Sequence, residues 1–495
     1  MYIRLFFLVS ILMLAIIPTS NLVVKGVTRE SIKDLYSIDI FESILNRVLV
    51  AQGISMNSYQ VIVGNDRWFF LGDRYAKTRT MSRKSGKSKD IIEASRTLSN
   101  AQTAWRFWMK AHGVDEYSIL IGPNKSTIYP EHTPKWAQPL GTSITDTLYA
   151  ADVNNVYVDA RESLKKSKHL VRGYYRTDTH WNNYGAGVAH QEFLRKLSLN
   201  HPDLTLLKSE AYAQTSTYPM AGGDLSSFLK IEAIEKDTMV VTAIEEQGIE
   251  RFMYDFNSKE LVYQGEGALF GDMNSMFLIK TPSALNDKKV LWLSDSFGTA
   301  QSQYMTASFN NVLKVHWGEM SGKDKLIDSV KSWKPNYVLV TVVEREVFSD
   351  AFKLFPPIIL SNEAQQVTKK VDLQPVKLHQ VKNNNARYTV DGVDPFLIYD
   401  FKNAIDGSKI PVLSFNINCL KPLASIPTQV FWRSLDQDFS AQNNIRFNAV
   451  QGDNQIQVPH WINQKNMTGI RIDLDGETEC VEFSQTNVVL GNYAL

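Results

Sequence analysis

Three continuous apolar runs constrain the fold of this chain more than any other feature. They are KKVLWLS (288–294), NNVLKVHW (310–317) and PNYVLVTVV (335–343). Strands buried on both faces of a sheet have this texture, because helices cover both faces of a parallel α/β sheet. Shorter runs at 117–122 and 155–160 are β-rich as well. The core from about 60 to 350 is therefore predicted to be α/β, with a mostly parallel sheet.

Residues 92–111 and 184–197 carry apolar residues in a helical pattern, which fits this α/β prediction. Beyond Pro356 the texture changes: short segments alternate apolar and polar residues, and Gly, Asn, Asp and Pro separate them. Such alternation with almost no helical period is typical of a β-sandwich. The expected parts are an α/β domain over 28–356, a polar connector over 360–385 and a β-sandwich over 386–495.

The N-terminus has the features of an export signal. An apolar run from Leu5 to Ile17 follows Arg4. Its length suits the core of a signal peptide and falls short of the roughly 20 residues of a membrane span. Because no small-x-small cleavage site follows Pro18, residues 1–24 are predicted to be a signal anchor or a signal peptide, with the anchor favoured. The main part of the chain is expected on the far side of the membrane.

Cysteine usage and charge add two constraints. Both cysteines, Cys419 and Cys480, lie near the end of the chain. Two thiols within one module of an exported protein indicate a disulfide, and two separate buried thiols are the alternative. The formal net charge is only +1, so no basic face is required and nucleic acid is not expected as a partner.

Small polar residues follow the apolar run that ends at residue 294. Ser294, Asp295 and Ser296 stand where a strand is predicted to end and a helix to begin. Open α/β sheets place their chemistry at this edge, so Ser296 is a candidate nucleophile on a sharp turn. The alternative is that these residues only cap the following helix.

A second polar segment, GYYRTDTHWNNYGA (173–186), contains an Asp-x-His pair. On an extended backbone Asp178 and His180 project to the same side. A nucleophilic serine needs a base, and the imidazole in turn needs an acceptor that fixes its tautomer. Asp178, His180 and Ser296 could fill these three roles. A metal site would require further ligands nearby, and none is found; a structural His in a turn is the remaining alternative.

Three further residues are candidates for binding substrate or an oxyanion. Gly223, in the pair Gly222–Gly223, permits a close backbone approach, although such pairs often only mark a turn. Arg345 follows a buried strand and could hold a carboxylate or a carbonyl oxygen; a local ion pair with its acidic neighbours is the alternative. Tyr184 follows His180 closely in the chain.

Six segments, in this order, resemble the AlgJ/AlgX family of polysaccharide O-acetyltransferases, whose domain is SGNH-hydrolase-like. They are VGNDRWFFLGD, IGPNKSTIYPEHTP, YYRTDTHWNNYGA, AGGDLSSFL, VLWLSDSFG and VTVVERE, within residues 59 to 350. The resemblance implies a Ser-His-Asp triad of Ser296, His180 and Asp178, with the serine last in the chain. It also implies a periplasmic location. Ser294 departs from the glycine that relatives commonly carry there, which affects the expected oxyanion geometry.

The function implied by this resemblance is transfer of an acetyl group, through a Ser296-bound intermediate, to hydroxyls of an exported polysaccharide. No soluble cofactor is expected. Because acetyl-CoA does not occur outside the cytoplasm, the resemblance implies a membrane-bound O-acyltransferase of the MBOAT class as the partner that relays acetyl. Two alternatives stay open: an esterase that removes acetyl groups from a glycan, and a non-catalytic polysaccharide-binding component of a secretion complex.

The C-terminal segments look similar to β-sandwich modules that accompany glycan-handling enzymes. From this likeness a carbohydrate-binding role is expected, with Phe431, Trp432 and Trp461 as candidate stacking platforms. The alternative is that these rings belong to the hydrophobic core.

Overall fold

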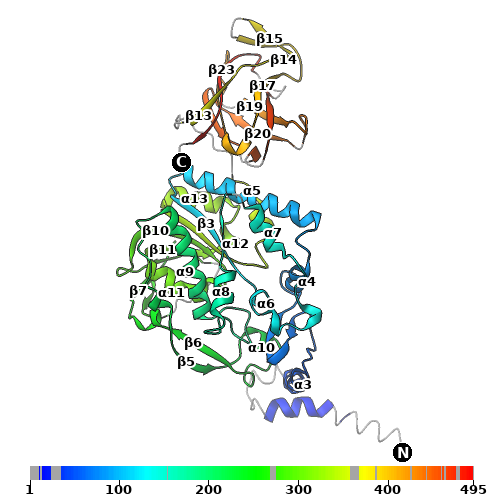
Figure 1. Cartoon of the computed structure of the whole chain (residues 1–495), viewed down its shortest axis with the longest axis vertical. Helices are drawn as coiled ribbons and strands as arrows, with labels where there is room; N and C mark the ends of the chain where they lie inside the picture. Colours follow the sequence, from blue (N-terminus) through cyan, green and yellow to red (C-terminus); the bar gives the residue numbers. More distant parts are fainter. Residues whose placement is uncertain are drawn as a thin grey trace, which may run out of the picture.

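The computed structural model shows two parts, each with its own core (Figure 1). It describes residues 11, 14–23, 35–152, 154–267, 275–356, 367–384, 387–423, 426–441, 443–458, 460–461, 464–474 and 480–493. Within these residues no helix is both long and apolar enough to cross a membrane. Much of the predicted leader, 1–24, lies outside the described residues, so its anchoring stays a prediction.

The first part is built on an eight-stranded sheet in the order β4-β3-β12-β10-β11-β9-β7-β8. The strands are β3 (Glu116–Gly122), β4 (Tyr157–Asp159), β7 (Arg251–Asp255), β8 (Leu261–Gly265), β9 (Phe277–Lys280), β10 (Asn286–Ser294), β11 (Phe309–His316) and β12 (Tyr337–Val343). The strands from β4 to β11 pair in parallel, whereas β9, β7 and β8 add an antiparallel extension. The α/β prediction is confirmed, and the sheet is mixed at one edge.

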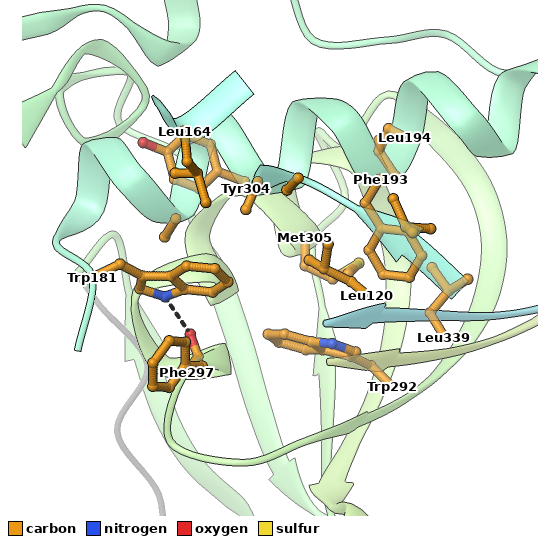
Figure 2. Close-up of a cluster of buried hydrophobic side chains, with 14 of the residues drawn as sticks. Leu120, Leu164, Trp181, Phe193, Leu194, Trp292, Phe297, Tyr304, Met305 and Leu339 are labelled. Carbon is orange, nitrogen blue, oxygen red and sulfur yellow. Dashed lines mark hydrogen bonds between the residues drawn. The ribbon is translucent and has the colours of Figure 1, made fainter. Parts of the chain in front are cut away.

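Helices cover both faces of this sheet, because alternate side chains of each strand point to opposite sides. On one face, Leu291 and Leu293 of β10 pack with α5 (Lys89–Ala111), α7 (Ile144–Ala151) and α13 (Asp324–Trp333). On the other, Trp292 packs with α8 (Arg161–Ser167), α9 (Asn183–Asn200) and α11 (Gly298–Ser308). Figure 2 shows this second layer, with Trp292 and Leu339 facing Phe193 and Met305.

A short hairpin and one helix precede this sheet. Strands β1 (Val61–Val63) and β2 (Phe69–Leu71) pair in antiparallel fashion. Helix α3 (Asp39–Ala51) packs against the domain through Val50, which shares a small core with Phe69 and Leu225. The first part of the chain is therefore a three-layer α/β domain with a hairpin at its side.

The second part consists of two packed antiparallel sheets, as predicted for a β-sandwich. One sheet has the order β15-β16-β23-β18-β21, with β13 also paired to β23, and the other has the order β14-β17-β22-β19-β20. The strands are β13 (Val367–Leu373), β14 (Lys377–His379), β15 (Val381–Asn384), β16 (Arg387–Val390), β17 (Phe396–Ile405), β18 (Val412–Cys419), β19 (Ile426–Ser434), β20 (Asn444–Ala449), β21 (Gly452–Gln457), β22 (Met467–Leu474) and β23 (Glu482–Tyr493).

Strands β13, β14 and β15 lie inside the range 360–385, which was expected to be a polar connector. That expectation is wrong from Val367 onward, because β13, β14 and β15 pair with β23, β17 and β16 despite their polar composition. Edge strands tolerate such polar sequences, since one of their faces meets solvent. The predicted connector therefore contributes three strands to the sandwich.

The disulfide between Cys419 and Cys480 is formed, at a sequence separation of 61. The predicted stacking platforms are wrong for two of the three rings: Trp432 and Trp461 are 1% and 0% exposed and belong to the core of the sandwich. Phe431 is 9% exposed and packs under the Arg471 guanidinium, 4.1 Å from its ring centroid. None of the three rings offers a free flat face to a sugar.

Candidate functional site

The carboxyl edge of the parallel strands gathers the candidate residues. Strands β3, β10 and β12 run in the same direction, so the residues that follow them lie at one edge of the sheet. Ser296 follows β10, Arg345 follows β12, and Asn124 and Lys125 follow β3. Gly122, the last residue of β3, leaves room there for Phe297 and Trp181; a Cβ at this position would lie 2.8 Å from the Phe297 ring.

Asp295 fixes the turn that carries Ser296. One of its carboxylate oxygens accepts the Phe297 N–H at 2.9 Å. The other accepts the Val343 N–H of β12 at 2.7 Å and the Trp317 indole N–H at 3.3 Å. The N-cap of α11 is Phe297 rather than Ser296, and it makes no side-chain cap hydrogen bond. The helix-capping alternative for Ser296 is thus not what the geometry shows.

The three residues of the predicted triad meet at this edge. His180 Nε2 lies 2.8 Å from Ser296 Oγ, and His180 Nδ1 lies 2.6 Å from Asp178 Oδ1. In the tautomer with the proton on Nδ1, that N–H donates to Asp178 and the Ser296 hydroxyl donates to Nε2. The arrangement can accept the hydroxyl proton of Ser296 and stabilise the imidazolium that results.

The segment that carries Asp178 and His180 is held by carboxylates on neighbouring elements. Asp237, at the start of β6 (Asp237–Thr242), accepts the N–H and the hydroxyl of Thr177 at 2.7 and 2.8 Å. Asp224, at the start of α10 (Asp224–Phe228), does the same for Thr179 at 2.7 and 2.6 Å. The side chains of Asp178 and His180 alternate with these anchored threonines.

A further hydrogen bond ties this segment to the serine turn. The Trp181 indole N–H donates to the Phe297 carbonyl at 2.9 Å, as Figure 2 shows. Trp181 is fully buried and immediately precedes Asn182, the N-cap of α9, whose side chain accepts the Gly185 N–H. The residues next to His180 and next to Ser296 are therefore joined directly, although they are far apart in the sequence.

Asp178 and His180 each stabilise the charged form of the other. Burial alone lowers the pKa of His180, but the hydrogen bond and the charge of Asp178 outweigh this effect and raise it above 6.5. Burial raises the pKa of Asp178, and the hydrogen bonds and charge of His180 reverse this and hold it well below 3.8. The Asp178 carboxylate is thus ionised at neutral pH and faces the imidazole.

Gly223 and Tyr184, two of the candidates for binding an oxyanion or substrate, make other contacts than those expected. The Gly223 N–H donates to Thr177 Oγ1 at 3.0 Å, so the expectation that it serves an oxyanion is wrong. Its missing side chain matters instead, because a Cβ there would lie 2.3 Å from Asp178 Oδ2. Tyr184 interacts with Ser167 at the end of α8 rather than with His180, which corrects its candidate role.

Arg345 remains beside the site. Its guanidinium donates to Asn124 Oδ1 at 3.3 Å and lies over the Phe297 ring, 5.7 Å from the centroid. With Asn124 and Thr179 it lines a small pocket. The neighbouring Glu344 does not form the local ion pair considered from the sequence; its carboxylate accepts from the Asn124 N–H and from two threonine hydroxyls.

Asp178, His180 and Asp224 also bring possible metal-ligand atoms within 4.8 Å of one another. Both oxygens of Asp224 already accept from Thr179. The second oxygen of Asp178 accepts the Asp224 N–H at 3.0 Å. Hydrogen bonds therefore account for this cluster without an ion.

Sequence reasoning found Asp178, His180 and Ser296 but missed the groups that hold them. Asp224, Asp237 and Asp295 are acidic residues at the ends of strands or starts of helices, where a cap is the ordinary interpretation. Nothing in their local sequence shows that they reach a distant loop. A polar residue beside paired glycines, as in AGGDLSS, is the signal that could have indicated Asp224.

Comparisons with known proteins find similarity over part of the chain. Residues 61–279 match the family model described as SGNH hydrolase-like domain, acetyltransferase AlgX, a range that ends before Ser296. The probable alginate O-acetylase AlgJ of Pseudomonas putida is 27% identical over 183 residues, which are 35% of this chain and 43% of the relative. The AlgJ of Azotobacter vinelandii is 24% identical over 36% of this chain and 44% of its own length. The chain thus spans less than half the length of these curated relatives.

Solved structures that align with this chain include PatB1 of Bacillus cereus, at 15% identity and a TM-score of 0.44, covering 60% of this chain and 97% of that one. The O-acetyltransferase domain of Pseudomonas putida AlgJ gives 18% identity and a TM-score of 0.37, covering 59% and 92%. At these TM-scores the fold assignment depends on the sheet topology and the family model. The family match confirms the resemblance for residues 61–279, which match an SGNH hydrolase-like domain model, and the sheet topology is consistent with that fold.

Proposed function

We propose that the protein is an O-acetyltransferase that moves an acetyl group through Ser296 to hydroxyls of an exported polysaccharide. The observation that supports it most directly is the hydrogen-bonded series from Asp178 through His180 to Ser296 at the edge of the sheet. The similarity to probable alginate O-acetylases supports acetyl as the group and a polysaccharide as the acceptor. The acceptor, the acetyl donor and the location are parts of this proposal.

In the first half-reaction, His180 Nε2 takes the proton of Ser296 Oγ while Oγ attacks the acetyl carbonyl carbon of the donor. The donor's leaving group departs with that proton, and an acetyl ester remains on Ser296. In the second, a sugar hydroxyl gives its proton to Nε2 and attacks the same carbon. Ser296 Oγ then leaves and takes the proton back, so the enzyme returns to its starting state.

The Ser296 N–H is the best-placed oxyanion donor, because it has no hydrogen-bond acceptor among the described residues. The Arg345 guanidinium lies next to the same turn, over Phe297, and is a second candidate. Removing one such donor typically raises a barrier by about 2.7–4 kcal/mol. Arg345→Ala is therefore expected to slow acetylation of Ser296 more than Arg345→Lys, which keeps the charge.

The proposed partner is a membrane-bound O-acyltransferase of the MBOAT class that supplies acetyl in the periplasm, where the N-terminal segment would hold the protein near the inner membrane. The test for the reaction uses an activated acetyl ester, the full chain in detergent and oligosaccharide acceptors. Acetylated sugar, detected by mass spectrometry, supports transfer. Release of free acetate alone would favour an esterase.

A second test separates catalysis from scaffolding. Ser296→Ala is expected to remove acetyl groups from the polymer made by cells that carry it, to the same extent as deletion of the gene. Ser332→Ala, which changes an exposed serine on α13, is the control and should leave acetylation in place. A polymer that keeps its acetyl content in the Ser296→Ala strain would instead favour a non-catalytic, polysaccharide-binding role.

For the sandwich we propose that a polar groove, rather than the buried tryptophans, binds the glycan. Strand register aligns Arg446 of β20, Gln429 of β19 and Asp473 of β22 in one row across the sheet. These residues line a groove of about 510 Å³. A guanidinium, an amide and a carboxylate in a row can each hydrogen-bond sugar hydroxyls. Arg446→Ala should weaken retention on polysaccharide affinity gels, whereas Lys465→Ala should not.

A further inference from the structure

Lys125 is a buried lysine that the proposed reaction does not use. It is the first residue of α6 (Lys125–Ile128), directly after β3, and is 4% exposed. Its ammonium donates to three backbone carbonyls of one segment: Tyr175 at 3.1 Å, Arg176 at 3.0 Å and Asp178 at 2.6 Å. The last of these is the carbonyl of the residue that holds His180.

We propose that Lys125 is a positioning residue that sets the geometry of the Asp178–His180 pair. It would do so by gathering the carbonyls of residues 175, 176 and 178 around one ammonium. This inference rests on the proposed function, because it assigns a role in that reaction. It is distinct from the anchoring by Asp224 and Asp237, which hold side chains and N–H groups of the threonines on either side of Asp178.

The hydrogen-bond count supports a role in positioning rather than in proton transfer. An ammonium has three N–H donors and no acceptor, and all three donors of Lys125 have partners in this segment. It therefore has no free donor for substrate. The remaining carbonyl of the segment, that of Thr177, accepts the Ser226 N–H instead. Of the three carbonyls on Lys125, that of Arg176 also accepts the Phe69 N–H at 3.0 Å. Those of Tyr175 and Asp178 would lose their donor without Lys125, at the cost of an unpaired polar group.

Burial makes the charged form of Lys125 less favourable than it would be in water. Burial lowers the pKa of Lys125 to about 7, although the carboxylates of Asp178, Asp224 and Asp237 act in the opposite direction. The ammonium also lies 5.7 Å from the Trp68 ring centroid and 5.3 Å from that of Phe70, in the β1–β2 hairpin. These rings limit its movement and add cation–π attraction. A methionine would replace the apolar stem of Lys125 but would leave the Tyr175 and Asp178 carbonyls without its N–H donors.

The test compares Lys125→Met with Lys168→Met in the full chain. Lys168 is a suitable control because its ammonium also donates to a backbone carbonyl near α6, that of Ile128, and lies over the Tyr129 ring. It does not touch the segment that carries Asp178. The first readout is the far-downfield proton resonance of the His180 Nδ1–H, assigned by its loss in His180→Gln. This signal reports the Asp178–His180 hydrogen bond whether or not acetyl transfer occurs.

The second readout is the rate of Ser296 acetylation by an activated ester, resolved into kcat and KM. We expect Lys125→Met to shift or abolish the resonance and to lower kcat roughly 10- to 100-fold with little change in KM, as for a misplaced base. Lys168→Met should leave both unchanged. An unaltered resonance and rate in folded Lys125→Met would overturn the proposal.

If Lys125→Met does not fold, Lys125→Gln, which keeps two N–H donors, replaces it. A resonance and rate between those of the parent and of Asp178→Asn then support the proposal, and parental values overturn it. Absence of acetylation in the parent protein would count against the proposed function alone, because the resonance comparison still decides the role of Lys125.

Discussion

Asp178 is the residue at which the hydrogen bonds of the site converge. Its carboxylate accepts from the His180 ring, from the His180 N–H at 2.9 Å and from the Asp224 N–H at 3.0 Å. Its carbonyl is held by Lys125. A carboxylate with this many donors keeps its charge and direction, so it can orient the imidazole without itself taking up a proton.

Asp178→Asn should change the pH dependence as well as the rate. His180 must be neutral to act as a base, and its pKa is raised above 6.5, so the rate of the parent should increase with pH through this raised pKa. Without the charge of Asp178, burial and the nearby Arg345 lower the pKa, and the acidic limb should move to lower pH. The rate on the plateau should fall by about 10,000-fold. Acetylation rates measured from pH 5 to 9 check this; an unmoved limb would contradict it.

Gly223→Ala tests the close approach of α10 to the site. The added Cβ would lie 2.3 Å from both Cβ and Oδ2 of Asp178, so Asp178 must move. We expect loss of Ser296 acetylation and a lower melting temperature. Gly173→Ala is the control, since its Cβ would meet other atoms only at 3.4 Å or more. Equal behaviour of the two variants would show that the approach of Gly223 to Asp178 is unimportant.

At the scale of elements, a disulfide joins two neighbouring strands of one sheet of the sandwich. The disulfide connects Cys419, the last residue of β18, to Cys480, just before β23, and both sulfurs are buried in the core. Strand β18 already pairs with β23, with Cys419 opposite Phe483. The disulfide therefore closes a long loop between two strands, β18 and β23, that are already hydrogen-bonded to each other.

Removing this disulfide should destabilise the sandwich more than the α/β domain. For a closed loop of 61 residues, the chain-entropy model gives about 4 kcal/mol of stabilisation. The double variant Cys419→Ala/Cys480→Ala should melt at a lower temperature in calorimetry and keep its rate of Ser296 acetylation. A coincident loss of both would indicate that the parts unfold as one unit.

The elements show where sequence reasoning succeeds and where it stops. Strands β10, β11 and β12 were predictable because burial on both faces leaves a continuous apolar run. The antiparallel edge of β7, β8 and β9 was not, since its short strands alternate only in part. Period-2 alternation places Phe431 and Trp432 on opposite faces of the strand, but it does not indicate which face packs in the core. The Asp178–His180 spacing was visible, whereas Lys125 acts on carbonyls that only the folded chain brings together.

At the scale of the whole molecule, the two parts touch through stacked rings. Phe355, near the end of the α/β domain, stacks on His460 of the sandwich at 4.4 Å between ring centroids. His460 in turn lies against Trp432 of the sandwich core, at 5.8 Å. In Figure 1 the sandwich adjoins α5 and α13, whereas α6 and α10, which hold the segment of Asp178, lie toward the other end.

Phe355→Ala should loosen this junction without affecting the reaction. Burial lowers the pKa of His460, so removing the covering ring should let it rise toward 6.5. An NMR titration of His460 measures this rise, and the rate of Ser296 acetylation should stay the same. Phe228→Ala, which removes a stacked ring on Tyr75 within the first part, is the control and should leave His460 unchanged. A constant His460 titration in both variants would contradict the role of Phe355.

The link between Trp181 and Phe297 has a consequence for how the protein is assembled during synthesis. The proton acceptor and the hydroxyl are made at different times, and the indole can find its carbonyl only after β10 has joined the sheet. A nascent chain that stops after β9 holds the imidazole and its carboxylate but has no group to esterify. Reactivity thus arises late and all at once, when the strand before Ser296 is inserted between two neighbours.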